Sequence, residues 1–249
     1  MPSRRTPQRP PPPAPAEDWA LFLDVDGCLL DLAGAPDAVV MPRKLPAVLT
    51  ALSQRLDGAV ALISGRALEN VERLFVPLQL PIAGLHGLER RSAAGVAPML
   101  PMPPTWDVVR EAAASVVASH PGTLLEDKGV ALALHWRNAP RAAGELLAFA
   151  EATLPRLPGY RLQHGDHVVE LRPATGDKGT AIVALLDEPP FRGRMPVFAG
   201  DDVTDEAGFA VVNARAGLSV VVGKREPTCA HYALRDPTAV RAWLAGQHP

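Results

Sequence analysis

The chain has 249 residues, of which 47% are hydrophobic and 21% charged, and its 25 Lys and Arg against 27 Asp and Glu residues give a formal net charge of −2. This apolar content supports a sizeable core and excludes a wholly disordered chain, while the near-neutral charge gives no basic footprint for nucleic acid. No apolar run approaches the roughly 18 residues of a membrane span. With only Cys28 and Cys229, neither a disulfide framework nor a cysteine-based zinc site is expected.

Proline dominates the start of the chain, where residues 1–15 read MPSRRTPQRPPPPAP. Because proline fixes φ and has no backbone N–H, neither a helix nor a sheet can propagate through this segment. Residues 1–17 are therefore predicted to form a disordered tail. The arginines in the tail are not followed by an apolar segment, so no secretory signal is predicted and the cytoplasm is the expected location.

Apolar runs and helical patterns alternate over residues 18–87. Runs typical of buried strands occur at residues 20–25 (ALFLDV), 59–63 (AVALI) and 81–87 (PIAGLHG). Apolar residues at helical spacing occur between them, over 42–56 and 68–75. This order predicts a parallel sheet covered by helices.

The middle of the chain has a different pattern. Residues 92–104 are rich in Pro, Gly and Ala and predict a hinge or loop. Helices are predicted over 107–118 and 141–154, and alternating strands over 130–137 and 167–172. These elements predict a small α+β module, residues 88–171, inserted into a larger domain formed by residues 18–87 and 172–249.

The α/β pattern resumes after the insert. A helix is predicted over 178–187, strands over 196–199 and 218–222, and a last amphipathic stretch over 239–244. The overall prediction is thus an α/β domain with a parallel sheet flanked by helices, plus the inserted module.

Four segments with reactive side chains follow apolar runs: Asp24-Val25-Asp26-Gly27, Ser64-Gly65, Asp177-Lys178-Gly179 and the run from Gly200 to Glu206 (GDDVTDE). Ligands of open α/β sheets bind at the carboxyl ends of the strands, so these segments are expected to converge. The acids that would meet there are Asp24, Asp26, Asp201, Asp202 and Asp205. Such carboxylates repel one another unless a cation lies between them, and oxygen ligands suit Mg²⁺.

The same residues predict phosphoryl chemistry. Asp24, the first acid after its strand, is placed as a covalent nucleophile. Asp26 suits a general acid for the leaving oxygen and then a base for water. Ser64 and the backbone N–H groups after it, starting at Gly65, would cradle an anion, and Lys178 would hold phosphoryl oxygens. Each motif alone is an ordinary turn or helix start, so the prediction depends on their combination.

In this order, DVDG, SGR, GDKG and GDDVTDE resemble the motifs of the haloacid-dehalogenase superfamily of aspartate-nucleophile phosphohydrolases. More narrowly, the chain resembles trehalose-6-phosphate phosphatases. The motifs behind this are Ile63-Ser64-Gly65-Arg66, Gly84-Leu85-His86-Gly87, Glu126-Asp127-Lys128-Gly129, His135-Trp136-Arg137 and Glu170-Leu171-Arg172-Pro173. The resemblance implies a Rossmann-like core with an inserted α+β cap.

The resemblance also implies a reaction: Mg²⁺-dependent hydrolysis of trehalose 6-phosphate to trehalose and phosphate through an aspartyl-phosphate on Asp24. Asp26 would protonate the sugar O6 and then activate water. The metal would be held by the Asp24 carboxylate, the Asp26 backbone carbonyl and Asp201, while Asp202 and Asp205 would be outer or additional ligands. Ser64 and Lys178 would bind the phosphate.

A disaccharide has many hydroxyl groups, so its site needs hydrogen-bond donors and acceptors together. Charged residues of this kind in the insert or its hinge are Glu126, Lys128, His135, Arg137, Glu170 and Arg172. The resemblance points to Glu126, Lys128 and Glu170 in particular as sugar contacts. Charged side chains at strand ends are more often simply solvated, which is the alternative for all six.

Other functions fit the same motifs. The chain could act on another sugar phosphate, such as sucrose 6-phosphate or mannosyl-3-phosphoglycerate, or be a phosphomutase. A catalytically inactive sugar-phosphate sensor is a further hypothesis, against which the presence of both Asp24 and Asp26 argues. The expected partner is a small-molecule sugar phosphate, with no nucleic acid, membrane or obligate protein partner.

Overall fold

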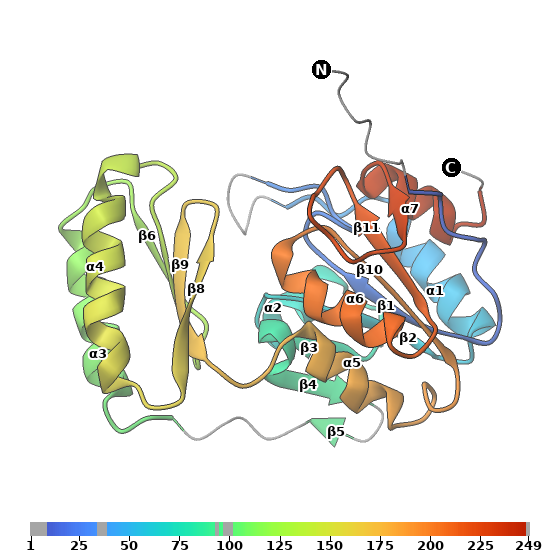
Figure 1. The fold of residues 1–249 in the computed structure, drawn as a ribbon, viewed down its shortest axis with the longest axis horizontal. Coiled ribbons are helices and arrows are strands. Elements are labelled where there is room, and N and C mark those ends of the chain that lie inside the picture. The colour runs from blue at the N-terminus through green and yellow to red at the C-terminus, as the bar shows by residue number, and fades with distance from the viewer. Residues whose placement is uncertain (1–8, 34–38, 93–94, 97–101, 248–249) are drawn as a thin grey trace, which may run out of the picture. The chain divides into compact units, whose positions relative to one another are not determined.

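The computed structural model describes residues 9–33, 39–92, 95–96 and 102–247 (Figure 1). The chain divides into two compact units. The first is formed by Met1–Ala97 and Asp177–Pro249, and the second by the continuous stretch Pro98–Gly176. We call the first unit the core and the second the insert, and describe each by itself.

The core is built on one sheet whose order, in the described residues, is β12-β11-β10-β1-β2-β3-β4-β5. The strands are β1 (Trp19–Asp24), β2 (Val60–Ile63), β3 (Ile82–Gly84), β4 (Glu89–Ser92), β5 (Gly95–Val96), β10 (Met195–Gly200), β11 (Leu218–Val222) and β12 (Tyr232–Leu234). From β12 to β3 all neighbours are parallel, and β4 and β5 continue the sheet in antiparallel pairing. The predicted α/β class with a mainly parallel sheet is confirmed.

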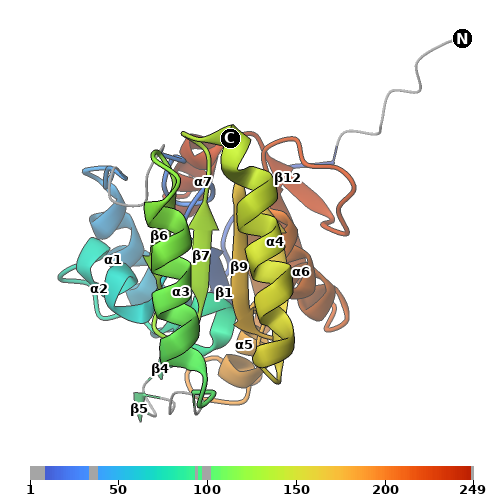
Figure 2. The same ribbon diagram turned by 90° about the vertical axis from the view of Figure 1, so that its left-hand side faces the viewer.

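Helices cover both faces of this sheet. They are α1 (Leu45–Arg55), α2 (Leu68–Leu74), α5 (Lys178–Leu186), α6 (Glu206–Asn213) and α7 (Pro237–Leu244). Figure 2 shows α1 and α2 on one side of the sheet and α5 and α6 on the other. This arrangement explains the continuous apolar sequence of the central strands, because a strand covered on both faces buries every side chain, as β1 does.

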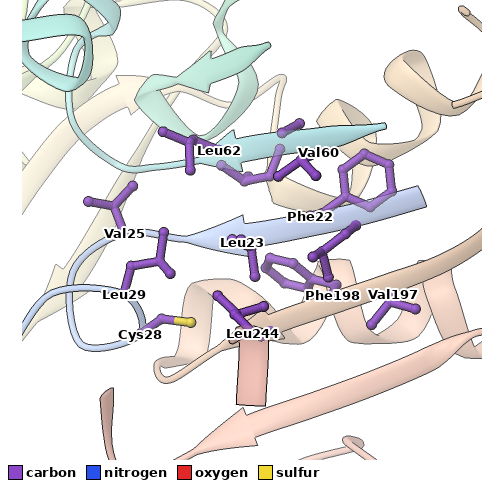
Figure 3. Close-up of a cluster of buried hydrophobic side chains, with 14 of the residues drawn as sticks. Phe22, Leu23, Val25, Cys28, Leu29, Val60, Leu62, Val197, Phe198 and Leu244 are labelled. Atoms are coloured by element: carbon purple, nitrogen blue, oxygen red, sulfur yellow. The ribbon is translucent and has the colours of Figure 1, made fainter. Parts of the chain in front are cut away.

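Large side chains from neighbouring strands fill the core (Figure 3). Phe22 of β1 stacks on Phe191 with ring centroids 5.3 Å apart, and Phe198 of β10 packs on Phe209 of α6 at 5.4 Å. Cys28 lies buried in the same cluster, as a small packing residue. This packing fixes β1 between β2 and β10 and so sets the position of Asp24 and the loop that follows it.

The insert has its own sheet and its own apolar cluster. Its strands are β6 (Leu124–Asp127), β7 (Leu132–His135), β8 (Tyr160–Gly165) and β9 (Val168–Pro173), antiparallel in the order β6-β7-β9-β8. Its helices are α3 (Trp106–Ala118) and α4 (Ala143–Thr153). Figure 2 shows both helices on the same side of β7 and β9, and the alternation along the strands follows from this. Leu132, Leu134, Val169 and Leu171 pack with helix residues, whereas the residues between them point to the opposite face.

The boundaries of the insert differ from those expected from the sequence. Residues 89–92 and 95–96, expected in the insert from position 88 onward, instead form β4 and β5 at the edge of the core sheet. At the other end, residues 172–176 belong to the insert rather than to the core, because β9 continues through Pro173. Residues 93–94 and 97–101 of the predicted hinge lie outside the described residues.

The predicted disordered tail also needs correction over residues 9–17. The Pro13 carbonyl accepts the indole N–H of Trp243 at 2.7 Å, the Pro10 carbonyl accepts the N–H of Ala233 in β12 at 3.1 Å, and Arg9 pairs with Glu226. Proline cannot donate a backbone hydrogen bond, but its carbonyl still accepts one, so a proline-rich segment can be fixed by donors of the folded core. Residues 1–8 lie outside the described residues.

No helix in the described parts of the chain combines the length and apolar character needed to cross a membrane.

Candidate active site

The reactive segments of the core converge at the carboxyl edge of its sheet. Asp24 is the last residue of β1, Ser64 follows β2 and Asp201 follows β10. These three strands are neighbours and run parallel, so their ends meet. From β1 the chain runs to β2 and then β3, which lie on one side of β1. The later strands β10, β11 and β12 lie on its other side. The site therefore lies where the strand order reverses, which is the position typical of ligand sites in open α/β sheets.

Three of the five predicted acids form one cluster. One carboxylate oxygen each from Asp24, Asp201 and Asp205 lies within 4.8 Å of the other two. The Lys178 ammonium lies among them, with Nζ 2.7 Å from Oδ1 of Asp24 and 2.6 Å from Oδ1 of Asp205. The second oxygen of Asp205 accepts the backbone N–H groups of Asp201 and Asp202, both at 2.9 Å. Asp205 thus holds both the lysine and the loop after β10.

Two glycines make this close approach possible. A Cβ on Gly27 would lie 2.1 Å from a carboxylate oxygen of Asp201, and Gly27 has a φ of +79°. A Cβ on Gly200 would lie 2.3 Å from the carboxyl carbon of Asp205. A side chain at either position would displace an acid of the cluster, so the glycines of DVDG and GDDVTDE are required by the carboxylates beside them.

The cluster carries more negative charge than its single lysine can balance. Burial raises the pKa of Asp24 well above its usual range, and the nearby Asp205 and Asp201 raise it further against the opposing effect of Lys178. Burial, Asp205 and Asp202 raise the pKa of Asp201 to about 7. For Lys178, burial acts to lower the pKa, but Asp205 and Asp24 outweigh it and the pKa is raised. Crowded carboxylates with raised pKa values are the environment that a divalent cation with oxygen ligands relieves.

Asp26 and Asp202 lie outside this cluster. The Asp26 carboxylate is held by both arms of Arg66, with Nε to Oδ2 and Nη2 to Oδ1 each at 2.7 Å. Asp202 is exposed and accepts the N–H and the hydroxyl of Thr204, both at 2.6 Å, as the cap of a 3₁₀ turn (Val203–Asp205). Asp26 is therefore oriented by a cation next to the cluster, whereas Asp202 shapes the loop that carries Asp205.

The residues of the predicted anion cradle lie at the end of β2. The Ser64 hydroxyl oxygen accepts the N–H of Arg66 at 3.1 Å, which leaves the hydroxyl proton to donate. A Cβ on Gly65 would lie 2.7 Å from Nε2 of His86, so Gly65 lets that ring pack against the loop. The first N–H of α2, that of Leu68, is taken by Glu89 at 2.7 Å, so the helix start itself is already capped.

Lys178 owes its position to the start of α5. Asp177 caps the helix by accepting the N–H of Thr180 at 2.7 Å. Gly179 lets α5 approach α6, because a Cβ there would lie 2.6 Å from the carbonyl oxygen of Ala207. The buried lysine is thus fixed by a cap on one side and by a close contact between two helices on the other.

In the insert, four of the six predicted substrate residues form a second polar cluster. His135 Nε2 lies 3.1 Å from Glu126 Oε2, and Lys128 Nζ lies 3.2 Å from Glu170 Oε2 and 3.9 Å from Glu126 Oε2. Glu126 and Glu170 face Ala133 from the strands on either side, so they occupy one row across the sheet. This row lies on the face opposite α3 and α4.

Arg137 and Arg172 are placed differently. Arg137 is exposed and pairs with Asp166 at 2.8 Å in the turn between β8 and β9. Arg172 is buried and donates to Oε1 of Gln163 at 2.9 Å and to the carbonyl of Gly176 at 2.8 Å. Arg137 therefore stands apart from the second polar cluster, and Arg172 contacts a neighbour of it.

Sequence reasoning did not assign three residues near these clusters: Arg66 as the partner of Asp26, Glu89 as the cap of α2, and Gln163. Arg66 is two residues after Ser64, and this adjacency was the available signal. Gln163 lies in β8, whose sequence YRLQHG alternates over Tyr160–Gln163 before His164 and Gly165. This period of two over four residues was the available signal for a strand, but it does not give the register that places Gln163 beside Glu170.

Comparisons with known proteins agree on one family. The family model described as trehalose-phosphatase matches residues 22–238. A probable trehalose-phosphate phosphatase of Sinorhizobium fredii is 48% identical over 212 residues, which is 85% of this chain and 80% of that protein. The trehalose-6-phosphate phosphatase of Escherichia coli K12 is 42% identical over 229 residues, 91% of this chain and 85% of that protein.

Solved structures agree as well. A trehalose-6-phosphate phosphatase related protein superimposes with a TM-score of 0.73 at 26% identity, covering 90% of this chain and 94% of that one. The C-terminal domain of a C. albicans trehalose-6-phosphate phosphatase gives a TM-score of 0.75 at 22% identity, covering 91% and 92%. The second likeness, at this low identity, supports the fold alone.

Proposed function

Because this chain belongs to the trehalose-phosphatase family and is an enzyme of that family, we propose that it hydrolyses trehalose 6-phosphate to trehalose and phosphate. The observation that carries the proposal is the cluster of three carboxylates around Lys178, in a chain 42% identical to a trehalose-6-phosphate phosphatase over 229 residues. A nucleophilic acid (Asp24), a fixed cation (Lys178) and a second acid two residues after the first (Asp26) are what a phosphoryl transfer through the protein requires.

The metal proposed for this site is Mg²⁺. The donor set fits, because the cluster offers carboxylate oxygens and carries excess negative charge. Asp205 already has both oxygens engaged, so Asp24 and Asp201 are the better ligands, together with the backbone carbonyl of Asp26. Mg²⁺ supplies charge neutralisation for the carboxylates and the phosphoryl oxygens.

The protein residues then act in two steps. In the first, a carboxylate oxygen of Asp24 attacks phosphorus, the bond from phosphorus to the sugar O6 breaks, and Asp26 gives its proton to O6 so that trehalose leaves. In the second, Asp26 takes a proton from a water molecule, which attacks the aspartyl-phosphate and releases inorganic phosphate. Lys178 and the hydroxyl of Ser64 hold the phosphoryl oxygens in both steps.

Arg66 adds a condition to this mechanism. The guanidinium engages both carboxylate oxygens of Asp26, and an oxygen held by Arg66 is not placed to exchange a proton with the sugar O6. We therefore propose that at least one oxygen of Asp26 leaves Arg66 when the substrate binds. Arg66 orients the acid in the resting enzyme.

The sugar contacts are proposed for the polar cluster of the insert. Glu126 and Glu170 accept from sugar hydroxyls, and Lys128 donates to them. His135 supports Glu126 through their hydrogen bond. Hydroxyl groups both donate and accept, so a face that alternates carboxylates with a cation suits them better than one of a single charge. The cytoplasmic location and the absence of a protein partner stay predictions from the sequence.

The test is phosphate release from trehalose 6-phosphate, sucrose 6-phosphate, glucose 6-phosphate and mannosyl-3-phosphoglycerate, with Mg²⁺ or with EDTA. We expect turnover of trehalose 6-phosphate that requires Mg²⁺ and is lost in Asp24→Asn. Asp26→Asn should lose phosphate release as well, because O6 lacks its acid in the first step and the water lacks its base in the second, and mass spectrometry of the wild-type enzyme quenched during turnover should show one added phosphoryl group.

Each alternative has its own outcome in this experiment. Turnover of a different sugar phosphate would retain the core chemistry and reject the assigned substrate. Transfer of the phosphoryl group to a sugar rather than to water would identify a phosphomutase. Saturable binding of trehalose 6-phosphate without release of phosphate would support a sensor.

A further inference from the structure

A row of four side chains crosses the open face of the insert's sheet. Glu126 faces Ala133, Ala133 faces Glu170, and Glu170 faces Gln163 on the strand beyond it. Directly opposed residues of antiparallel strands point to the same side, so all four share the face that α3 and α4 leave uncovered. Gln163 therefore lies next to Glu170 on the side away from Ala133, at a place that the proposed function does not use.

Arg172 fixes which end of the Gln163 amide points where. Nη1 of Arg172 lies 2.9 Å from the Gln163 side chain, and Nη2 lies 2.8 Å from the carbonyl oxygen of Gly176. A guanidinium only donates, so the amide must present its oxygen to Arg172, which leaves the NH₂ group on the other side. Arg172 is buried and cannot easily move, so the amide is held in this orientation.

The row then has a regular chemical pattern. Two carboxylates flank the small side chain of Ala133, Lys128 bridges toward both of them, and the Gln163 amide adds a neutral donor beside Glu170. A pair of neighbouring sugar hydroxyls can donate one hydrogen bond to a carboxylate and accept another from an adjacent N–H. Glu170 and the NH₂ group of Gln163 form such a pair of groups.

We propose that Gln163, oriented by Arg172, is a specificity-determining residue that donates its amide N–H to a sugar hydroxyl bound by Glu170. The inference rests on the proposed function and extends its sugar contacts by one residue. Arg172, the buried arginine of the Glu-Leu-Arg-Pro motif, then positions Gln163 and makes no sugar contact of its own.

Two variants test this together: Gln163→Glu keeps an acceptor for Arg172 but exchanges the NH₂ donor for a negatively charged oxygen, and Gln163→Leu removes the donor without adding charge. With trehalose 6-phosphate we expect KM to rise about ten-fold, with the loss falling on KM rather than on kcat, as one hydrogen bond predicts. The ratio of the rate on trehalose 6-phosphate to that on p-nitrophenyl phosphate, which has no sugar, should fall to a similar extent. Gln163→Leu should show the same shift.

His164→Gln is the matched control, since His164 is the next residue on the same strand and faces Val169 on the other side of the sheet. Its KM should stay within two-fold of the wild type, by the same hydrogen-bond scale. A Gln163→Glu enzyme with the wild-type KM overturns the inference. The inference is also overturned if KM rises in Gln163→Leu but not in Gln163→Glu. The acceptor for Arg172 would then be what matters, and Gln163 would serve only to hold Arg172.

Failure of the proposed function is distinguishable from failure of this inference. A wild-type enzyme that ignores trehalose 6-phosphate but hydrolyses another sugar phosphate rejects the proposed substrate. The same KM comparison, made with that sugar phosphate, then decides whether Gln163 contacts the sugar.

Discussion

The carboxyl edge of the core sheet and the open face of the insert's sheet both gather charged side chains, but they do so in different surroundings. In the core, the side chains of Asp24, Asp205 and Lys178 are 5%, 0% and 3% exposed, and Lys178 is 2.6–2.7 Å from both acids. In the insert, Lys128 and Glu170 are 11% and 9% exposed and Glu126 and His135 are 23% and 28% exposed, and the contacts of Lys128 are longer, at 3.2 and 3.9 Å.

The difference in burial indicates how much stability depends on each cluster. A buried ion pair leaves an uncompensated charge when one partner is removed, so the core cluster couples stability to catalysis. In the insert the contacts of Lys128 are longer and Glu126 reaches water, so the loss of one partner there should cost less stability. Under the proposed function, the core would hold the fixed chemistry and the insert would choose the substrate.

Removal of the buried cation should have the largest effect. We expect Lys178→Met to lower the free energy of unfolding by about 3 kcal/mol, because Asp24 and Asp205 lose their partner in a dry site. Phosphate release should be lost as well. Chemical denaturation in EDTA measures the first effect, and the deficit should shrink as the pH falls, because the two acids then become neutral. A deficit below 1 kcal/mol at neutral pH would mean that the cluster is open to water.

The next largest effect is expected at Asp201 of the core, whose pKa is raised to about 7. Asp201 is protonated in the folded protein below about pH 7, but in the unfolded chain only below about pH 4. The metal-free protein therefore loses stability as the pH rises between these values. Asp201→Asn removes this loss and should raise the free energy of unfolding in EDTA by about 2 kcal/mol at pH 8, and by much less at pH 4.

Mg²⁺ should reverse the relative stability of the wild type and Asp201→Asn. Saturating Mg²⁺ is expected to raise the melting temperature of the wild type and to raise that of Asp201→Asn much less, because the variant has lost a ligand. Equal stabilisation of both proteins by Mg²⁺ would contradict the assignment of Asp201 as a ligand.

The insert provides the matched counterpart of the buried lysine. Lys128→Met makes the same change as Lys178→Met, in the less deeply buried cluster. We expect the free energy of unfolding to fall by about 1 kcal/mol, less than in Lys178→Met because Glu126 reaches water. KM for trehalose 6-phosphate should rise about ten-fold through the loss of a charged donor. Denaturation and steady-state kinetics on the two variants side by side compare the clusters directly. A large loss of stability in Lys128→Met would remove the distinction between them.

The smallest effect is expected at Arg137. Its guanidinium and the Asp166 carboxylate are 55% and 75% exposed, and neither joins the row across the sheet. Arg137→Ala should leave KM within about two-fold and stability within about 0.5 kcal/mol of the wild type. A ten-fold rise in KM would restore Arg137 to the sugar contacts that the sequence suggested.

Local patterns predicted the buried elements of the fold well. Leu218–Val222 was predicted as a strand and is β11, and the helix predicted over 107–118 is α3 (Trp106–Ala118). These segments have a clear period because one or both of their faces are covered. The strands β4, β5, β6, β8 and β12 were not predicted, since they are short or lie largely at the surface and have at most a brief period of two.

The site was predictable to the extent that motifs carry it. The sequence placed Asp24, Asp201 and Asp205 at one edge, and the structure brings them together. It could not separate them from Asp26 and Asp202, because the partners that hold those two acids depend on side-chain direction. Pairs such as Arg172 with Gln163 depend on the register of two strands, which no single segment reveals.

The interruption of the core by the insert also bears on how the protein is made. Asp24 and Lys178 are 154 residues apart in the chain. At roughly 5–20 residues per second, a ribosome adds Lys178 about 8–30 seconds after Asp24. During that interval Pro98–Gly176 is synthesised as one continuous stretch with an apolar cluster of its own. The strand β10, which pairs with β1, has not yet been synthesised. The whole insert is therefore synthesised before Asp24 gains the partner Lys178, and the cluster of carboxylates is among the last features that the nascent chain can assemble.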